Sequence, residues 1–459
     1  MSTRTLSPAA VEPHVAVGLV LLVACGAAVA GFGGAVTDLR IAAAGGAAAA
    51  AALFLLMAAG WIEPLLVVAF SVPLPALYST PSLRIATAAP VTAVAVAAWL
   101  MRLGLADEPA RFGRIPFRTL AALGAVLALT TVTAQYPLTS VRELANYAVL
   151  FLLLLAATDL FRRTPDGLDS VLNALVAGAA VCGVLAVLET LTILPGKFPR
   201  FDTAYNRAAL GFGQPNGLGL FLAITVPLAV HRLRTSRGVA RIAAAFALLS
   251  AAAGLIATFS RGSWLALLAG TLPLAFTGDR RLVLRIWVTA IVVAVLADVV
   301  SGGAMRDTVV RTIGDWVIEQ RAALMLAGVT MFIAYPLTGV GPGGYAGSLD
   351  RFGPQIPQLW DYLPTPHNAW VQMAAETGIA GVILFTVFLG VTLAVQIRRI
   401  RAEDPGAGLE RASLNRALLW SFTTCCASCM VVWPFAHGTG EAVMLVAAAI
   451  FASPPRERS

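Results

Sequence analysis

VLNALVAGAAVCGVLAVLETLTIL, residues 171–194, is the stretch that decides the fold of this chain. Glu189 is the single charged side chain in it. An α-helix rises about 1.5 Å per residue, so a run of about 20 apolar residues crosses the hydrocarbon core of a bilayer. Because lipid cannot satisfy the backbone of an open strand, the stretch predicts a membrane-spanning helix.

Comparable runs recur along the whole chain. Of the 459 residues, 58% are hydrophobic and only 12% are charged, and the mean hydropathy is +0.82. Soluble domains carry about 25% charged residues, so roughly half of the usual charge is missing. Length alone would suggest several soluble domains. The succession of apolar runs instead predicts one transmembrane domain, 1–459.

The apolar runs predict an all-α polytopic membrane protein with about 12–14 transmembrane helices. A tight turn near Trp61 and Pro64 separates the second run from the third, and the tenth run is short. Many others follow the first run, so it predicts a span rather than a cleaved signal peptide. The fourteen predicted spans are 14–34, 41–60, 61–80, 87–103, 117–135, 145–160, 171–194, 211–230, 241–258, 261–277, 284–300, 376–396, 414–434 and 438–452.

The arginines assign each loop to one side of the membrane. With the N-terminus in the cytoplasm, 21 of the 31 arginines fall in segments predicted to be cytoplasmic, as the positive-inside rule requires. Both termini are then cytoplasmic. The one long hydrophilic interruption, 301–375, becomes an external loop that contains short helices, including a helix-like stretch at 321–335. This loop is predicted to carry part of a catalytic site.

The net charge of +8 does not indicate a nucleic-acid partner. Lys197 is the single lysine, and the arginines lie between apolar runs, where they suit membrane topology better than a DNA-binding face. The five cysteines all lie inside apolar runs, so no disulfide framework is legible. Among them Cys425, Cys426 and Cys429 have no neighbouring His or acid in the sequence that would favour a metal site.

Five of the ten outward arginines are explained as interfacial or loop residues: Arg40, Arg84, Arg142, Arg306 and Arg351. Arg261 has more context, because it lies in Ser260-Arg261-Gly262-Ser263-Trp264 at the outer start of a predicted span. Ser260 is a candidate N-cap. A helix N-terminus adds free N–H groups and a positive dipole end to the guanidinium. We therefore predict an anion site at the membrane surface around Arg261.

Further cations lie near this position in the predicted topology. Arg200 and Arg207 share a short outer loop with Lys197, and Arg321 opens the helix-like stretch of the long loop. Since guanidinium groups match phosphate oxygens in shape, Arg200 and Arg207 are predicted to contact an anionic substrate.

The external loop continues with PLTGVGPGGY at 336–345. Its spacing partly resembles a nucleotide-binding glycine loop, but no strand precedes it and Pro342 interrupts it. A rigid turn that lets the backbone approach a ligand is the better interpretation. It makes Gly341 and Gly343 candidate substrate contacts.

Two of the four histidines, His367 and His437, are predicted to face outward. His367 and Asn368 directly precede a helix that enters the membrane. Histidine exchanges a proton near neutral pH, so His367 is a candidate catalytic base and Asn368 a candidate substrate contact. The outer segments contain no Asp-x-Asp or Glu-x-Asp pair, so no metal site is predicted.

Together these residues resemble the O-antigen ligase and polymerase superfamily of bacterial envelope glycan enzymes. The resemblance covers about residues 200–385, and its motifs share one order and one predicted side of the membrane. The matching features are Ser260-Arg261-Gly262 with the apolar span after it, Arg321 leading into the glycine turn, and His367-Asn368 followed after nine residues by Gly378-x-x-Gly381.

The resemblance implies a glycosyltransferase of the bacterial cytoplasmic (inner) membrane whose active site faces outward. Its donor would be an undecaprenyl-diphosphate-linked glycan, and its acceptor a lipid-anchored or glycan hydroxyl. Transfer would need no metal or cofactor and would invert the anomeric centre. On this pattern Arg261 and Arg321 hold the diphosphate and His367 serves the acceptor, while Arg207 is added from its position alone.

Two kinds of alternative stay open. Within the superfamily, a polysaccharide polymerase or a protein O-oligosaccharyltransferase differs from a ligase in its acceptor. From another class, a lipid-linked glycan flippase or transporter would place charges midway along its spans. The distinctive charges here lie at the outer ends of predicted spans and in one outer loop.

The arginine distribution predicts the result of a topology experiment. Reporter tags at either end of the chain or inside 231–241 should report the cytoplasm, and a tag near residue 350 should report the outside. A cytoplasmic signal from residue 350 would contradict the site assignment, because His367 would then face the wrong compartment.

Overall fold

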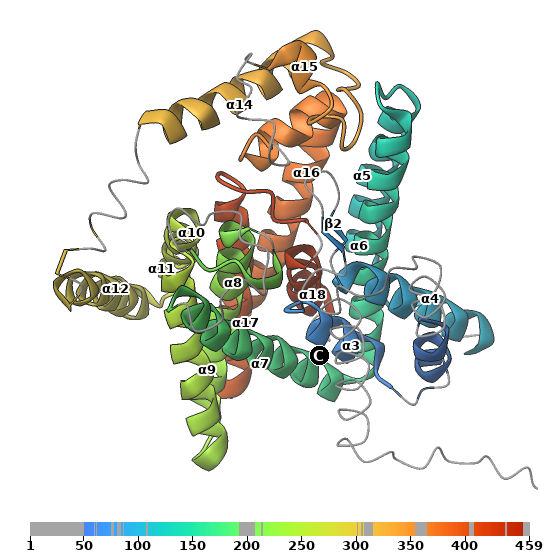
Figure 1. Cartoon of the computed structure of the whole chain (residues 1–459). Coiled ribbons are helices and arrows are strands. Elements are labelled where there is room, and N and C mark those ends of the chain that lie inside the picture. The colour runs from blue at the N-terminus through green and yellow to red at the C-terminus, as the bar shows by residue number, and fades with distance from the viewer. Residues whose placement is uncertain are drawn as a thin grey trace, which may run out of the picture.

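The computed structural model describes residues 50–452, apart from 59, 61, 75–77, 80–83, 86, 107–108, 192–206, 213, 301, 304–305, 307–314, 354–364, 404–407 and 437. Long helices form a bundle, and shorter segments cover one of its ends (Figure 1). The elements are α3 (Pro64–Ser71), β1 (Tyr78–Ser79), β2 (Arg84–Ile85), α4 (Ala88–Ala106), α5 (Arg114–Val132), α6 (Pro137–Arg163), α7 (Pro165–Thr190), η2 (Leu210–Phe212), α8 (Pro215–Thr235), α9 (Gly238–Ala257), α10 (Arg261–Ala269), α11 (Leu272–Ala275), α12 (Arg280–Val300), α14 (Asp315–Ala334), α15 (Leu349–Phe352), α16 (Ala369–Arg401), α17 (Leu409–Ser428) and α18 (Thr439–Ala452).

Seven of the described helices are long and apolar enough to cross a membrane, namely α4 to α9 and α16. Each coincides with a span predicted from the sequence, and α12, α17 and α18 coincide with three more. The predicted all-α polytopic membrane fold is therefore confirmed. The helix-like stretch expected in the external loop is α14, and α15 is a second short helix there.

The predicted span at 61–80 is wrong. Among the residues of this span that the structure describes, the helix is limited to the eight of α3, because Pro73 follows and proline cannot donate to a continuing helix. The chain then forms a two-stranded antiparallel pair in which Tyr78 lies opposite Ile85. Of the two spans predicted before it, 14–34 lies outside the described residues, and 41–60 is described as helix only at 50–58.

Two other predicted boundaries change. The short span at 261–277 is not one helix but two, α10 and α11, which separate at Gly270 and Thr271. Pro273 is the second residue of α11, and a Cβ atom on Gly270 would meet Thr424 Oγ1 of α17 at 2.3 Å, so the break fits tightly against a neighbouring helix. The span predicted at 376–396 belongs to α16, which begins earlier, at Ala369.

The centre of the bundle contains α8 and α18. All fourteen residues of α18 are buried, as is 72% of the apolar window of α8. In α5, α9 and α16 the buried share falls to 33%, and large apolar side chains such as Leu129 and Leu249 are exposed. An exposed apolar surface of this kind is the lipid-facing side of a membrane bundle.

Small residues allow α7 and α9 to cross closely. A Cβ atom on Gly183 of α7 would lie 2.0 Å from the carbonyl oxygen of Ser250 in α9. A Cβ atom on Gly254 would lie 2.5 Å from the Cα atom of Gly183. Close backbone approach through glycine is a common way of packing helices in membranes, where burial of apolar surface supplies little driving force.

The loop that follows α14, predicted to be external, is attached to the bundle at a kink in α16. Gly378 has a φ of 65°, which interrupts the helical hydrogen bonds of α16. The interrupted backbone groups pair with the loop instead: Val340 N donates to Ala375 O at 2.8 Å, Gly341 N to Glu376 O at 3.0 Å, and Ile379 N to Pro336 O at 2.9 Å. The kink therefore leaves no cost in unpaired backbone groups at these positions.

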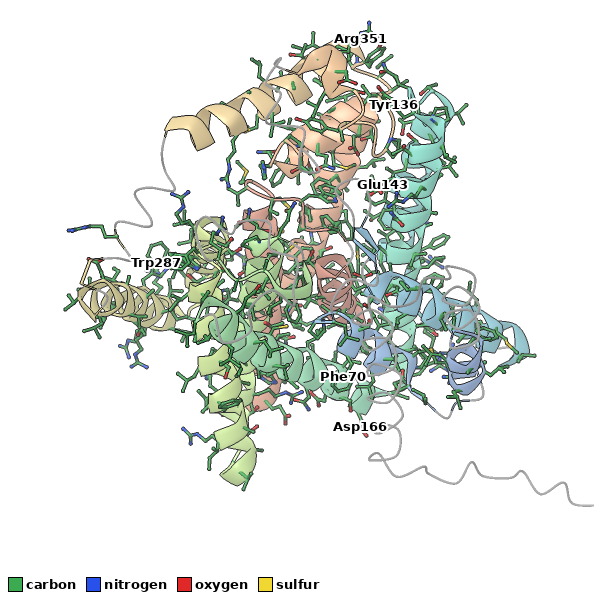
Figure 2. All side chains as sticks on the ribbon, viewed as in Figure 1. Phe70, Tyr136, Glu143, Asp166, Trp287 and Arg351 are labelled. Atoms are coloured by element: carbon green, nitrogen blue, oxygen red, sulfur yellow. The ribbon has the colours of Figure 1, made fainter. Side chains whose placement is uncertain are left out.

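A carboxylate ties several segments together at the opposite end of the bundle. Asp159 of α6 is 1% exposed, and it accepts hydrogen bonds from Trp99 Nε1 at 2.9 Å, from Arg111 N at 2.6 Å and from Arg163 Nε at 3.0 Å. These partners belong to α4, to the loop before α5 and to α6 itself. Figure 2 shows Asp166, close in sequence, at the end away from Tyr136 and Arg351.

Replacing Asp159 with alanine should strongly destabilise the bundle. The change leaves the Arg163 guanidinium and two N–H donors without their acceptor, which typically costs about 3 kcal/mol or more. The melting temperature of the purified protein in detergent, followed by size-exclusion chromatography after heating, measures the effect. Asp166→Ala removes an exposed carboxylate of the same region and should change little; equal melting temperatures for the two variants would contradict the role of Asp159.

Candidate active site

One cavity of about 300 Å³ lies between the beginnings of α8 and α10, the helix α14 and the segment 431–432. Three arginines from separate segments line it: Arg207 before η2, Arg261 at the start of α10, and Arg321 on α14. The lining that the structure describes contains no carboxylate. Three guanidinium groups in a concave site of this kind favour an anionic ligand.

Arg207 is held to the end of α9 and to the start of α8. Its Nε donates to Thr258 O at 2.9 Å, and its Nη2 donates to Asn216 Oδ1 at 3.3 Å. The turn after it is fixed by the buried carboxylate of Glu189, whose Oε2 accepts from Ala209 N at 3.0 Å and from Leu210 N at 3.1 Å. The guanidinium is thus fixed in direction as well as in position.

The beginning of α10 differs from the expected capped helix. Ser260 occupies the N-cap position but makes no side-chain cap bond, so the predicted cap is wrong. Its hydroxyl instead donates to Asn216 Oδ1 at 3.0 Å and lies 2.8 Å from Ser263 Oγ. Phe259 before it has a φ of 48°, an unfavourable left-handed conformation for a bulky residue. The turn from α9 into α10 is therefore shaped by its contacts across the cavity wall.

Two glycines allow this close arrangement. A Cβ atom on Gly262 would meet Val431 Cγ2 at 2.7 Å, and one on Gly219 of α8 would meet Ser260 Cβ and Ser263 Oγ, each at 2.8 Å. The glycine of the Ser-Arg-Gly motif is thus required by packing beside the cavity. It brings Arg261 against the wall that Val431 forms.

His367 lies at the head of α16. The Asn368 side chain caps this helix by accepting from Trp370 N at 3.0 Å and Val371 N at 3.1 Å, and Ala369 N donates to Cys429 O at 2.7 Å. Cys429 comes two residues before Val431 of the cavity wall. His367 itself has a backbone φ of 51°, which is uncommon for a residue other than glycine. Such strain is kept where the surrounding structure fixes it, as at the cap by Asn368.

Electrostatic interactions connect His367 to the cavity. Burial and, secondly, the nearby Arg321 cation lower the pKa of His367 from 6.5 to about 4, so the imidazole is neutral at pH 7. Burial also lowers the pKa of Arg321, and the charge of Arg261 lowers it further. Burial and the neighbouring cations both oppose positive charge here, so an anion would be stabilised by Arg261, Arg321 and His367 together.

The other predicted site residues lie elsewhere. Gly341 and Gly343 are not among the residues that line the cavity, and the close approach that they allow is to protein: a Cβ atom on Gly341 would meet Ala134 at 2.3 Å, and Gly343 N donates to Glu376 Oε2 at 3.0 Å. Asn368 acts as a helix cap, as described above. Arg200 and His437 lie outside the described residues.

Comparison with known families agrees with this geometry. Residues 245–386, somewhat under a third of the chain, match the family described as O-Antigen ligase. The matched part of the chain, 245–386, is therefore similar to the O-antigen ligase family. The resemblance read from the motifs is thereby confirmed, and no curated protein matches the chain.

The region matched to the O-antigen ligase family contains Arg261, Arg321 and His367, whereas Arg207 and Asn216 precede it. Asn216 and the cavity wall at 431–432 were not predicted from the sequence. Asn216 directly follows the proline that opens α8, and its place beside a predicted anion site was the available signal. Val431 and Val432 give no chemical signal, because only the fold brings them to the cavity.

The protonation of His367 can be tested without an activity assay. Diethyl pyrocarbonate modifies the neutral imidazole, so the extent of His367 modification, read by peptide mass spectrometry, should fall on acidification with a midpoint near pH 4 rather than 6.5. In Arg321→Gln the midpoint should move to higher pH, because a repelling cation is removed. A midpoint near 6.5 in the unaltered protein, or one insensitive to Arg321, would contradict this electrostatic link.

Proposed function

We propose that the protein is a membrane glycosyltransferase that transfers or polymerises a glycan carried on undecaprenyl diphosphate, at the outer face of the cytoplasmic membrane. The observation that carries the proposal is the convergence of Arg207, Arg261 and Arg321 on one cavity, with His367 electrostatically coupled to Arg321. The similarity of residues 245–386 to the O-antigen ligase family supports the same reaction class.

The arginines suit a leaving diphosphate. A guanidinium donates two parallel hydrogen bonds to phosphate oxygens and keeps its charge at any physiological pH. As the bond between the anomeric carbon and the phosphate oxygen breaks, negative charge grows on the diphosphate. Fixed positive charge placed before the reaction stabilises that change directly, so the step requires no metal ion in this proposal.

The cavity also offers a path for the lipid part of the donor. Leu265, one turn along α10 from Arg261, lines the cavity and is 67% exposed on the apolar surface. Phe259, Val431 and Val432 add further apolar lining. A diphosphate held by the arginines can therefore leave its polyprenyl chain in the membrane beside α10.

His367 is proposed as the base for the acceptor. Its neutral imidazole takes the proton of the acceptor hydroxyl while that oxygen forms a bond to the anomeric carbon and undecaprenyl diphosphate departs with the bonding electron pair. Attack on the face opposite the leaving group inverts the anomeric centre. A bound diphosphate offsets the repulsion between Arg321 and a protonated His367. The pKa of His367 therefore rises, and the imidazole becomes a better base once the donor is in place.

The outward orientation is proposed from the arginine distribution. Arg321 of α14 lines the cavity, and α14 belongs to the loop predicted to be external. Figure 1 shows α14 and α15 over one end of the bundle. A flippase is disfavoured by the same arrangement, because the arginine cavity is placed at one end of the bundle rather than midway along its spans. Ligase, polymerase and protein O-oligosaccharyltransferase activities differ in the molecule that accepts the glycan.

The proposal predicts separate effects for the base and the anion site. Purified protein is incubated with an undecaprenyl-diphosphate-linked glycan and candidate acceptors in the presence of a metal chelator, and chain extension and transfer to a lipid anchor are scored. His367→Ala should reduce transfer by about 10²–10⁴-fold while donor binding is retained, since proton transfer by a positioned side chain is typically worth that much. Arg261→Lys keeps the charge but loses the paired geometry, so it should weaken donor binding.

His437→Ala serves as the control, as the other histidine predicted to face outward. Near-normal transfer by His367→Ala, with His437→Ala inactive, would exclude His367 as the base. Wild-type behaviour of Arg261→Lys would reduce that arginine to a surface anchor. Activity abolished by the chelator and restored by magnesium would contradict a metal-independent reaction.

A further inference from the structure

We infer that Asn216 is a further donor-binding residue, whose side-chain N–H₂ group donates to the diphosphate beside the three arginines. The inference rests on the proposed function, and it assigns to α8 a direct part in substrate binding. Asn216 is the second residue of α8 and lines the cavity. Its chemistry follows from the hydrogen bonds already made by its oxygen.

The orientation of the Asn216 amide is determined by Arg207. A guanidinium has five donors and no acceptor, so the amide atom that Arg207 Nη2 contacts at 3.3 Å must be the oxygen, Oδ1. The usual ambiguity between the oxygen and nitrogen of an asparagine side chain is thereby removed. Nδ2, on the other branch of the amide, is turned away from this contact.

The hydrogen bonds of the Ser260 and Ser263 hydroxyls agree with this orientation of the Asn216 amide. Ser260 Oγ lies 3.0 Å from Asn216 Oδ1, which can only accept, so the Ser260 hydroxyl must donate its hydrogen there. The 2.8 Å contact between Ser260 Oγ and Ser263 Oγ must then be donated by Ser263. The hydrogens of both hydroxyls are used within the protein, and Oδ1 accepts from two donors.

The amide nitrogen of Asn216 differs from the amide oxygen in its hydrogen bonding. Within the part of the chain that the structure describes, Nδ2 makes no hydrogen bond. Asn216 thus presents two N–H donors in a cavity whose charged groups are also donors only. A phosphate oxygen accepts several such bonds, and donors prearranged in this way bind it without reorganisation.

A purely structural role for Asn216 predicts different behaviour on substitution. In that case its oxygen alone would matter, as the acceptor that holds Arg207 and Ser260. Asn216→Asp separates the two roles, because a carboxylate of the same shape keeps the acceptor and pairs well with Arg207. It replaces the N–H₂ group by an oxygen that cannot donate and that repels phosphate.

The experiment measures binding of undecaprenyl diphosphate to the full-length purified protein in detergent, with undecaprenol as the probe that lacks phosphate. Asn216→Asp should weaken undecaprenyl diphosphate binding by at least about 100-fold, because a donor is lost and a like charge is added. Undecaprenol binding and the melting temperature should stay near those of the unaltered protein. Asn216→Ala should also weaken diphosphate binding, but less, since it adds no charge.

Gln214→Glu is the matched control. It makes the same amide-to-carboxylate change two residues earlier, at the N-cap of α8, and Gln214 does not line the cavity. It should therefore have a much smaller effect on diphosphate binding. Equal weakening by Gln214→Glu and Asn216→Asp, or unchanged binding in Asn216→Asp, would overturn the inference.

The same measurements separate this inference from the proposed function. Diphosphate binding that is lost in Arg261→Ala but retained in Asn216→Asp would leave the proposed function in place and exclude Asn216 as a ligand. Failure of the unaltered protein to bind undecaprenyl diphosphate would overturn both. A fall in melting temperature for Asn216→Asp as large as that for Asp159→Ala would indicate a structural role for Asn216 and would also count against the inference.

Discussion

The arrangement of the end of the bundle beside α14 depends on backbone pairing between the segment 336–341 and the kink in α16. At Gly378 the helix gives up its own hydrogen bonds, and the carbonyls of Ala375 and Glu376 accept from the loop instead. In a membrane bundle an unpaired backbone group is costly, so the loop and the kink require each other. This pairing ties α14, which carries Arg321, to the helix whose head carries His367. The coupling between an arginine and a histidine 46 positions apart in sequence follows from that attachment.

The charge arrangement in the cavity is unfavourable without a ligand. Burial disfavours the charged form of Arg321, and the neighbouring charge of Arg261 disfavours it further. Packing contacts of the bundle offset this unfavourable free energy. Gly262 packs against Val431, Gly219 against Ser260, and Arg207 against the end of α9. Stability contributed by the packing therefore maintains a site whose charges would be balanced by an anionic substrate.

Much of this architecture could be predicted from the sequence, because lipid imposes a simple rule on length and hydropathy. The runs that became α4 to α9 needed no knowledge of tertiary contacts, and the Ser-Arg-Gly and His-Asn motifs marked two elements near the cavity. Where the sequence failed, local chemistry was overruled by partners distant in sequence. Ser260 has the side chain of a cap but bonds to Asn216 instead. The run at 61–80 is a different case, because a residue of the run itself, Pro73, follows the end of α3. The sequence predicted that Gly341 and Gly343 approach a ligand, but their neighbours are α6 and Ala134 just before it, which no local pattern reveals.

Leu265 of α10 lines the cavity and is also exposed on the apolar surface. In the proposed reaction the donor would enter there from the membrane rather than from bulk water, because its polyprenyl chain would keep it within one leaflet. Its encounter with Arg261 is then a two-dimensional search, governed by the number of donor molecules per unit area of membrane and by lateral diffusion. Turnover of such an enzyme would follow the surface density of its donor, and diluting the membrane with inert phospholipid at constant total donor would slow it.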